Sequence, residues 1–469
     1  MFRFRWLAAL LLAVCAAAAA DDLPAEVQLA LQRAQVPSEA FGAVLVDAAD
    51  GTTRLAVNAD QPMNPASLTK ILTTYAALER LGPAWTWSTP VWLHGTLHRG
   101  VLDGDLVVKG SGDPTLVVER LWLALRRVRQ LGVDVVKGDI VLDNDAFVVP
   151  SGNAADFDGD ATRPYNVRPA ALLFNFKSVS YSFVPDGAAG VARVLAEPAL
   201  AGVTVARSVP LSPGPCDDWR GALKIELGAR SVRFAGRYPA ACGEQAWPVA
   251  DPNPDSYNAR LIEALWRAVG GRLTGSAHAG RAPADGAPAF ELRSPPLAEV
   301  VREINKYSNN LMAQQLFYTL DLARHPETPA TQAGARETLR GWLAGKLGEL
   351  PADWVLDNGS GLSRETRLPP RAFARLLAQA FAGGLMPELL ASFPVAGSDG
   401  TLRKAPIPPG RTHLKSGSLR DVAALAGEVL ADSGRRYLLV AMVQHPNANN
   451  ARPALDALVQ WALHDAPAR

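Results

Sequence analysis

The sequence predicts an α+β fold in which an antiparallel sheet is flanked by helices and carries a large, mainly β insertion. Alternating apolar runs occur near both ends of the chain, and helical patterns lie between them. Short β-like runs over residues 91–292 separate the first helical pattern from the others. The 469 residues also exceed the size at which a single hydrophobic core stops growing, about 250–300 residues, so we expect more than one domain.

The composition is that of an ordinary globular protein. Hydrophobic residues make up 48% of the chain and charged residues 20%, which excludes a disordered or fibrous protein. The formal net charge is +1, so the chain has no excess of basic residues of the kind that binds nucleic acid or an anionic membrane. Three cysteines are too few for a disulfide scaffold or a four-cysteine zinc site.

Residues 1–20 have the pattern of a secretory signal peptide. Two arginines, Arg3 and Arg5, precede an uncharged run that ends in small residues before Asp21. The alternative is an uncleaved transmembrane helix, but that needs about 18–20 apolar residues and this run is shorter. We therefore expect export to the periplasm, with no transmembrane anchor left after processing.

The first structural elements after this segment are a hairpin and a helix. The runs Phe41–Asp47 and Thr53–Val57 flank Asp50-Gly51, a pair typical of a tight β-turn. Pro65 then suits the start of a helix, and Gly82-Pro83 its end. Apolar residues follow at helical spacing, namely Ile71, Leu72, Tyr75, Leu78 and Leu81.

The middle of the chain has a different sequence pattern. Gly- and Pro-containing turns separate β-like runs at Leu106–Lys109, Asp139–Leu142, Ser178–Val184 and Lys224–Leu227. One helix is expected at Val117–Leu131, and Arg281–Pro288 has the composition of a linker. We predict that residues 91–292 form an insertion of two nested subdomains, and that residues 21–90 and 293–469 form one discontinuous domain.

The last part of the chain returns to helices and ends with a second hairpin. Helical patterns cover Pro296–Thr319, Gln332–Lys346, Pro370–Phe381 and Ala451–His464. Between the last two, Ala423–Leu430 and Arg436–Val443 flank the turn Asp432-Ser433-Gly434. Strands at both ends of the chain, with helices between them, predict one sheet assembled from both ends.

Two cysteines, Cys216 and Cys242, remain after removal of the signal peptide. An even pair in an exported chain favours a disulfide, here with a structural role. It would close a loop of about 25 residues and stabilise the fold by roughly 3–4 kcal/mol. The alternative is a pair of free buried thiols.

Several common catalytic motifs are missing from the sequence. It contains no HExxH, CxxC, GxSxG, P-loop or strand-linked GxGxxG pattern, and its seven histidines are scattered. A metallohydrolase or a Ser-His-Asp hydrolase therefore has little support.

A possible nucleophile and base occur together in Pro65-Ala66-Ser67-Leu68-Thr69-Lys70. Ser67 and Lys70 are three positions apart at the start of a helix, so they share one face. A serine hydroxyl needs a base to take its proton, and a lysine can be that base if burial or a neighbouring cation lowers its pKa. The alternative is a helix cap followed by a solvated lysine.

A second candidate is Ser308-Asn309-Asn310, where Ser308 offers a hydroxyl relay and Asn310 an amide that could hold a substrate or orient a lysine. The alternative is helix capping. A competing match, Ser151-Gly152-Asn153, lies in a turn without a neighbouring lysine, so we discount it.

The third candidate is Lys415-Ser416-Gly417-Ser418, just before the last hairpin. In an extended strand Lys415 and Gly417 face one way, and Ser416 and Ser418 the other. Glycine lets a substrate backbone lie against the strand edge, and a cation near Lys70 would lower its pKa. The alternative is an ordinary turn.

The ordered set of three motifs resembles that of the penicillin-binding protein and serine β-lactamase superfamily. The 238 positions between Lys70 and Ser308 leave room for the large insertion of the class C low-molecular-mass penicillin-binding proteins, the D-alanyl-D-alanine carboxypeptidases/endopeptidases. Further stretches that resemble this family are Gly110–Leu116, Asp357–Arg364 and Pro394–Leu402. Two residues depart from its pattern: Ser416 replaces a more usual threonine, and Asn358 stands where an aspartate-glycine junction is expected.

The resemblance implies an acyl-enzyme mechanism on peptidoglycan. Ser67 would attack the penultimate D-Ala carbonyl of a stem peptide, with Lys70 as base and Ser308 as proton relay to the leaving amine. Water would then hydrolyse the ester, and cross-links would be cut in the same way. No metal or organic cofactor is implied, and β-lactams would inhibit by acylating Ser67.

The resemblance also implies the substrate-binding residues. Asn310 would hold the substrate amide and help to fix Lys70, while Lys415 would tune the local field. Ser416 and Ser418, on either side of Gly417, would bind the terminal carboxylate. The oxyanion hole would be the backbone N–H groups of Ser67 and Ser418.

Two other functions are possible for this fold. A β-lactamase or esterase needs fast deacylation, but no clear Glu-x-x-x-Asn motif lies between Ser308 and Lys415. A non-catalytic wall-binding module would not need three intact motifs. The sequence therefore favours the peptidase.

Overall fold

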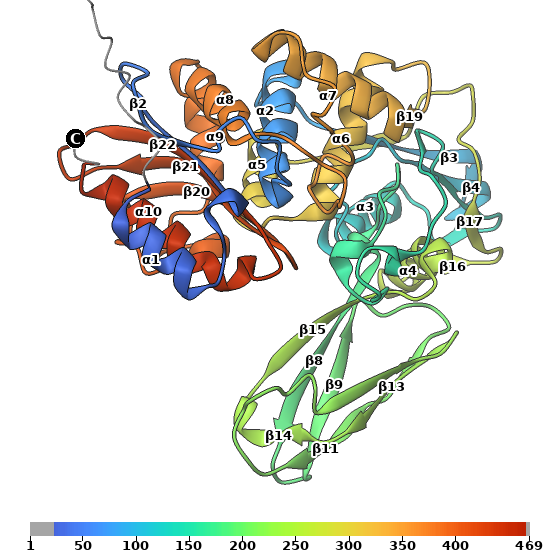
Figure 1. Cartoon of the computed structure of the whole chain (residues 1–469). Coiled ribbons are helices and arrows are strands. Elements are labelled where there is room, and N and C mark those ends of the chain that lie inside the picture. The colour runs from blue at the N-terminus through green and yellow to red at the C-terminus, as the bar shows by residue number, and fades with distance from the viewer. Residues whose placement is uncertain (1–22, 466–469) are drawn as a thin grey trace, which may run out of the picture.

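The computed structural model describes residues 23–465 (Figure 1). The predicted signal peptide lies outside this part. Within residues 23–465, no helix is long and apolar enough to cross a membrane.

One antiparallel sheet is built from both ends of the chain, which confirms the predicted α+β class. Its strand order is β2-β1-β22-β21-β20, and both predicted hairpins belong to it. The strands are β1 (Phe41–Asp47), β2 (Thr53–Val57), β20 (Thr412–Leu419), β21 (Val422–Leu430) and β22 (Arg436–Gln444). Pairing of β1 with β22 places the N-terminal hairpin beside the C-terminal one (Figure 1).

Helices bury both faces of this sheet. On one face lie α1 (Ala25–Arg33) and α10 (Arg452–Leu463), which pack against each other and the sheet (Figure 1). Alternate residues of β22 face opposite layers: Leu439 and Ala441 pack towards α1 and α10, whereas Leu438 and Val440 pack towards the other helices. This two-sided burial explains why β21 and β22 are almost continuously apolar.

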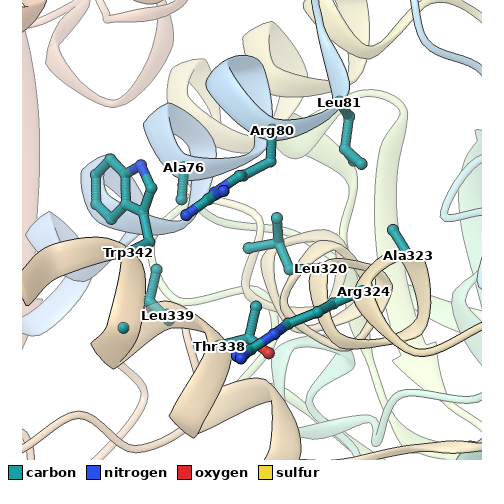
Figure 2. A pocket seen from close by; sticks show the side chains of 10 residues that line it. Ala76, Arg80, Leu81, Leu320, Ala323, Arg324, Thr338, Leu339 and Trp342 are labelled. Atoms are coloured by element: carbon teal, nitrogen blue, oxygen red, sulfur yellow. The ribbon is translucent and has the colours of Figure 1, made fainter. Parts of the chain in front are cut away.

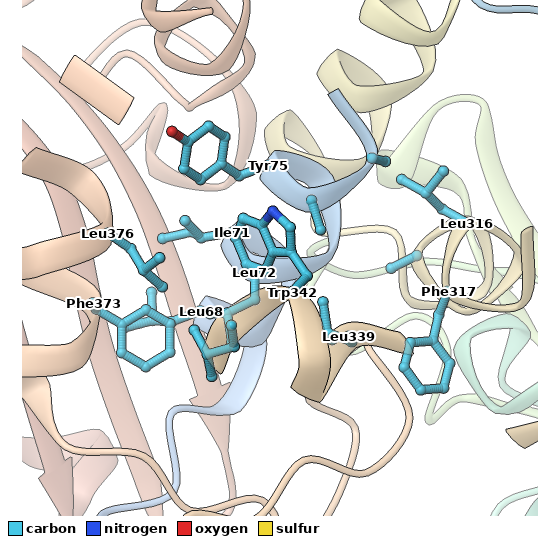
Figure 3. Close-up of a cluster of buried hydrophobic side chains, with 14 of the residues drawn as sticks. Leu68, Ile71, Leu72, Tyr75, Leu316, Phe317, Leu339, Trp342, Phe373 and Leu376 are labelled. Carbon is cyan, nitrogen blue, oxygen red and sulfur yellow. The ribbon is translucent and has the colours of Figure 1, made fainter. Parts of the chain in front are cut away.

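The other face is covered by a helical layer centred on one buried helix. Its members are α2 (Thr69–Leu81), α5 (Leu297–Lys306), α6 (Asn310–Arg324), α7 (Gln332–Leu347), α8 (Pro370–Ala382) and α9 (Met386–Ser392). Ile71, Leu72 and Tyr75 of α2 pack with side chains of α6, α7 and α8, including Phe317 and Trp342 (Figure 3). Burial of α2 on nearly all sides fixes the position of the residues at its start.

The predicted helix Pro296–Thr319 is in fact two helices. The break falls at Tyr307–Asn309, where Ser308 has a φ of 56° and Asn309 caps α6 by accepting a hydrogen bond from Met312 N–H. Left-handed backbone is rare for serine and cannot continue a helix. The apolar spacing continues across the break, so the sequence pattern gave no sign of it.

Most of the middle of the chain forms two further bodies. The first is a sheet with the path β16-β5-β4-β3-β18, extended by β6 and β17, against which α3 (Val118–Gln130) and α4 (Pro254–Ala268) pack. Its strands are β3 (Ser88–His98), β4 (Val101–Lys109), β5 (Val135–Val136), β6 (Ile140–Asp143), β16 (Arg272–Leu273), β17 (Ala277–Ala279) and β18 (Phe290–Arg293). Ser88 pairs with Arg293, so the chain leaves and re-enters the helical layer at adjacent positions.

The second body is a β lobe that projects away from the rest (Figure 1). It contains β8 (Ser178–Asp186), β9 (Val191–Glu197), β10 (Thr204–Val205), β11 (Ser208–Ser212), β12 (Leu223–Leu227), β13 (Ser231–Gly236), β14 (Tyr238–Pro239) and β15 (Gln245–Ala250). A disulfide joins Cys216 to Cys242 in this lobe. A short pair of strands, β7 (Phe147–Val148) and β19 (Ala330–Thr331), links the insertion to the helical layer. The predicted boundaries at 91 and 292 stay a prediction.

Candidate active site

Ser67 lies in a tight turn at the start of the buried helix α2. A 3-10 helix, Ala66–Leu68, precedes α2, and Ala66 has a φ of 47°. The side chain of Asn64 holds this turn, because its Oδ1 accepts a hydrogen bond from Ala66 N–H at 2.9 Å. Ala66 and Leu68 are buried while Ser67 is partly exposed, so the turn presents the Ser67 hydroxyl to the surface.

Lys70 is fully buried one turn further along and points back at Ser67. Its Nζ lies 3.0 Å from Ser67 Oγ, 2.5 Å from Asn310 Oδ1 and 2.6 Å from the carbonyl oxygen of Ser360. No carboxylate of residues 23–465 forms an ion pair with it. The alternative of a helix cap and a solvated lysine is wrong, because Lys70 is buried and Ser67 makes no capping hydrogen bond.

Burial and the charge of Lys415 both favour the neutral form of Lys70. Desolvation, and then the charge of Lys415, lower the pKa of Lys70 well below its ordinary value. A neutral amine has two N–H donors and one lone pair. The oxygens of Asn310 and Ser360 can take the two N–H bonds, which leaves the lone pair for the hydroxyl proton of Ser67. The geometry is that of a serine with a general base.

The buried Lys415 and the partly exposed Ser308 form a second pair beside the first. Lys415 Nζ donates hydrogen bonds to Ser308 Oγ at 2.9 Å and to the carbonyl oxygen of Ser416 at 2.7 Å. Burial lowers the pKa of Lys415 to about 7. The turn at Ser308 brings its hydroxyl to this amine, and α6, which starts at Asn310, brings the amide to Lys70.

Two glycines let neighbouring segments close on the Ser67 turn. A Cβ on Gly417 would lie 2.8 Å from the carbonyl oxygen of Pro65, and one on Gly361 would lie 1.8 Å from that of Ala66. The sequence suggested that Gly417 makes room for a substrate backbone. The structure gives a further reason, since β20 itself passes within contact of the turn that carries Ser67.

The turn Asp357–Leu362 supplies a group that sequence reasoning missed. Asn358 Oδ1 accepts hydrogen bonds from Ser360 N–H at 3.1 Å and Gly361 N–H at 3.2 Å, and so fixes the turn. This orients the Ser360 carbonyl towards Lys70. Asn358 departs from the expected family pattern, but its side-chain amide stabilises this turn.

Arg452 and Thr401 were also missed. Arg452, at the start of α10, donates a hydrogen bond to Ser418 Oγ at 2.9 Å, and Thr401 Oγ1 lies 2.7 Å from Ser416 Oγ. Among the described residues Arg452 has no carboxylate partner within ion-pair distance. Both serines of β20 therefore have a polar neighbour from a distant segment.

Two cavities share Ser67, Ser308 and Ser418 as lining residues. One, of about 470 Å³, is lined by residues that include Ser308, Thr401, Ser416, Ser418 and Arg452. The other, of about 710 Å³, is lined by residues that include Phe157, Asp158, Arg163, Tyr165, Asn310 and Arg364. Both volumes are in the range of ligand sites. Residues 157–165 come from the middle of the chain, and the Arg364 guanidinium lies 4.8 Å from the centre of the Phe157 ring, so this segment forms one wall of the groove.

Comparison with known proteins identifies the family of this arrangement. The family model described as the D-Ala-D-Ala carboxypeptidase 3 (S13) family matches residues 23–464. The D-alanyl-D-alanine carboxypeptidase of Actinomadura sp. is 28% identical over 97% of this chain and 88% of its own length. The D-alanyl-D-alanine carboxypeptidase DacB of Haemophilus influenzae is 27% identical over 81% of this chain and 80% of its own. A crystal structure of penicillin binding protein 4 (dacB) from Haemophilus influenzae has a TM-score of 0.74 at 22% identity, covering 92% of this chain and 99% of that one.

Proposed function

The chain belongs to the D-Ala-D-Ala carboxypeptidase 3 (S13) family, and on this premise we propose that it is a serine peptidase of peptidoglycan stem peptides. As a carboxypeptidase it releases the terminal D-Ala, and as an endopeptidase it opens a cross-link at the same centre. β-Lactams acylate Ser67. The observation that carries the proposal is the buried Lys70, whose amine has two oxygen acceptors and lies within reach of the Ser67 hydroxyl.

Acylation proceeds by attack of Ser67 Oγ on the carbonyl carbon of the penultimate D-Ala. The hydroxyl proton passes to Lys70, and the carbonyl oxygen becomes an oxyanion that the backbone N–H groups of Ser67 and Ser418 stabilise. The C–N bond then breaks, and the leaving nitrogen receives a proton through Ser308, which Lys415 holds in position. The products are an ester on Ser67 and a free amine, and water hydrolyses the ester to regenerate the enzyme.

The two cavities determine which way the substrate peptide lies across Ser67. Ser416, Ser418 and Arg452 line the smaller one, so it receives the carboxylate next to the scissile amide. The larger cavity, walled by residues 157–165, receives the rest of the stem peptide. This substrate lies in the cell wall, and we propose that the protein acts there, in the periplasm, after export by the predicted signal peptide.

The function is tested by mixing the purified protein with a stem peptide that ends in D-Ala-D-Ala, with a cross-linked muropeptide and with a fluorescent penicillin. We expect D-Ala from the first, monomers from the second and a stable covalent label from the third. If penicillin is instead turned over rapidly and neither muropeptide changes, the protein is a β-lactamase on the same fold.

We propose that Arg452 binds the terminal carboxylate together with Ser416 and Ser418. Its guanidinium hydrogen-bonds to Ser418 Oγ and has no carboxylate partner in residues 23–465, so a substrate carboxylate would complete its bonding. A charge-assisted hydrogen bond of this kind is worth about 1.5–3 kcal/mol, so Arg452→Gln should raise KM for a D-Ala-D-Ala peptide about tenfold or more with less effect on kcat. A peptide with a terminal carboxamide is the control: equal losses with both peptides would contradict the assignment.

Lys415 should set the pH at which Lys70 becomes active. The charge of Lys415 lowers the pKa of Lys70, and Lys415 carries that charge below its own pKa of about 7. In Lys415→Gln the pKa of Lys70 rises, so a higher pH is needed to free its lone pair. We expect the acid limb of the rate of penicillin acylation to move to higher pH, as measured by stopped-flow labelling. A limb that stays in place or moves to lower pH would show that Lys70 does not control it.

A further inference from the structure

A separate cavity of about 430 Å³ lies at the far end of the helices that carry Lys70 and Asn310 (Figure 2). It is enclosed by the C-terminal halves of α2 and α6 and by the middle of α7. Its lining residues are Ala76, Arg80, Leu81, Leu320, Ala323, Arg324, Thr338, Leu339, Gly341 and Trp342. None of them belongs to the catalytic groove described above.

The base of this cavity is apolar, and its rim carries two cations. Leu320, Leu339 and Trp342 are buried, whereas Arg80 and Arg324 are exposed. Figure 2 shows both arginine side chains running towards α7, with Leu320 between them. Among residues 23–465, neither guanidinium forms an ion pair or a hydrogen bond. An apolar floor beneath two unpaired guanidinium groups is complementary to an anion with an apolar body.

The nearby acidic groups do not neutralise these arginines. Glu79 pairs with Lys346 and accepts a hydrogen bond from Trp342 Nε1 at 2.8 Å. Asp321 is buried beneath Thr338 and accepts hydrogen bonds from Thr331 N–H at 3.1 Å and the Thr338 hydroxyl at 3.3 Å. Each arginine lies in the last turn of its helix, where a cation offsets the helix dipole. The helix dipole therefore accounts for each arginine by itself, but it does not account for the cavity between the two arginines.

Gly341 keeps the α7 wall of the cavity open. A Cβ at this position would meet nothing within 4 Å, so packing of the chain itself does not require glycine there. Glycine in the interior of a helix weakens the helix relative to alanine, and it is favoured where a ligand approaches the backbone closely. Gly345, one turn later, also has open space but does not line the cavity, which makes it a matched control.

We propose that this cavity is a binding site for an amphipathic anion, an apolar chain or ring that carries a single carboxylate or sulfonate. The apolar part lies on Leu320, Leu339 and Trp342, and the anionic group lies between Arg80 and Arg324. The site is independent of acylation at Ser67.

The probes are 8-anilinonaphthalene-1-sulfonate, whose fluorescence rises in an apolar site, and octanoate as its competitor. We expect saturable fluorescence with one site per chain and displacement by octanoate, but not by octylamine, which has the same chain and the opposite charge. Arg80→Gln with Arg324→Gln should weaken both anions about tenfold or more, since two charge-assisted contacts are lost. Gly341→Leu should abolish binding by filling the cavity.

Two controls keep the outcome clear. Gly345→Leu and Arg127→Gln, the latter an exposed arginine in the last turn of α3, should leave binding unchanged. Penicillin labelling of Ser67 shows that each variant is folded, so a failed site and a failed function are distinguished. Absence of saturable binding to wild type, equal displacement by octylamine, or full binding by labelled Gly341→Leu would each overturn the proposal.

Discussion

Ser67→Ala should release no measurable D-Ala from a stem peptide and should take up no fluorescent penicillin. Removing the nucleophile of a serine peptidase lowers kcat by about 10⁴-fold or more, because the remaining oxyanion hole and binding groups cannot form the acyl-enzyme. Of the predicted changes, this one leaves the least activity. It is measured by chromatography of released D-Ala and by in-gel fluorescence.

The same variant should remain folded. Lys70 keeps its contacts to Asn310 Oδ1 and to the Ser360 carbonyl, and Ser67 is only partly buried. A thermal melt should therefore place Tm within a few degrees of wild type. Release of D-Ala at the wild-type rate by folded Ser67→Ala would show that another group is the nucleophile.

The parts of the site that were predictable are those set by local spacing. Ser67 and Lys70 share a face because they are three positions apart on a helix, and this holds wherever the helix packs. The contact of Lys415 with Ser308 depends instead on the order of the sheet strands and on a left-handed residue at 308. Only the family resemblance brought those two residues together in advance.

The parts that were missed have no distinctive sequence pattern. Every residue has a carbonyl, so nothing marks that of Ser360 as a partner of Lys70. Arg452 follows Ser418 by 34 positions and begins a helix, where an arginine normally faces solvent. Its contact with Ser418 depends on how α10 packs against the sheet, which the local sequence does not determine.

The fold also contains parts that were predictable from the sequence and parts that were not. The apolar strands of the main sheet were predicted with bounds close to those observed, because burial on both faces requires continuous apolar residues. Of the long hairpin formed by β3 and β4, only the segment Leu106–Lys109 was expected, and the second half of β3 is largely exposed. Exposed strands show no alternation of apolar and polar residues, so the sequence pattern contains little that identifies them.

Lys70→Arg should reduce acylation by about 10²–10⁴-fold, the range supplied by a positioned general base. The guanidinium stays protonated at any pH at which the protein is folded, so it has no lone pair for the Ser67 proton. Its forked donors can still reach the oxygens of Asn310 and Ser360, which makes the variant a test of basicity rather than of hydrogen bonding. The measurement is the rate of penicillin labelling between pH 6 and about pH 9, in which the acid limb should disappear.

A second substitution guards against misfolding in this buried site. Lys70→Met has a similar length and no charge, so it removes the base without adding the bulk of a guanidinium. We expect it to lose acylation as well, while circular dichroism reports a folded chain. Near-normal labelling of either folded variant would mean that the Ser67 proton goes elsewhere. Another amine of the site is that of Lys415, whose Nζ donates a hydrogen bond to Ser308 Oγ at 2.9 Å. A Lys415→Gln change in the same background would then abolish the remaining activity and identify that route.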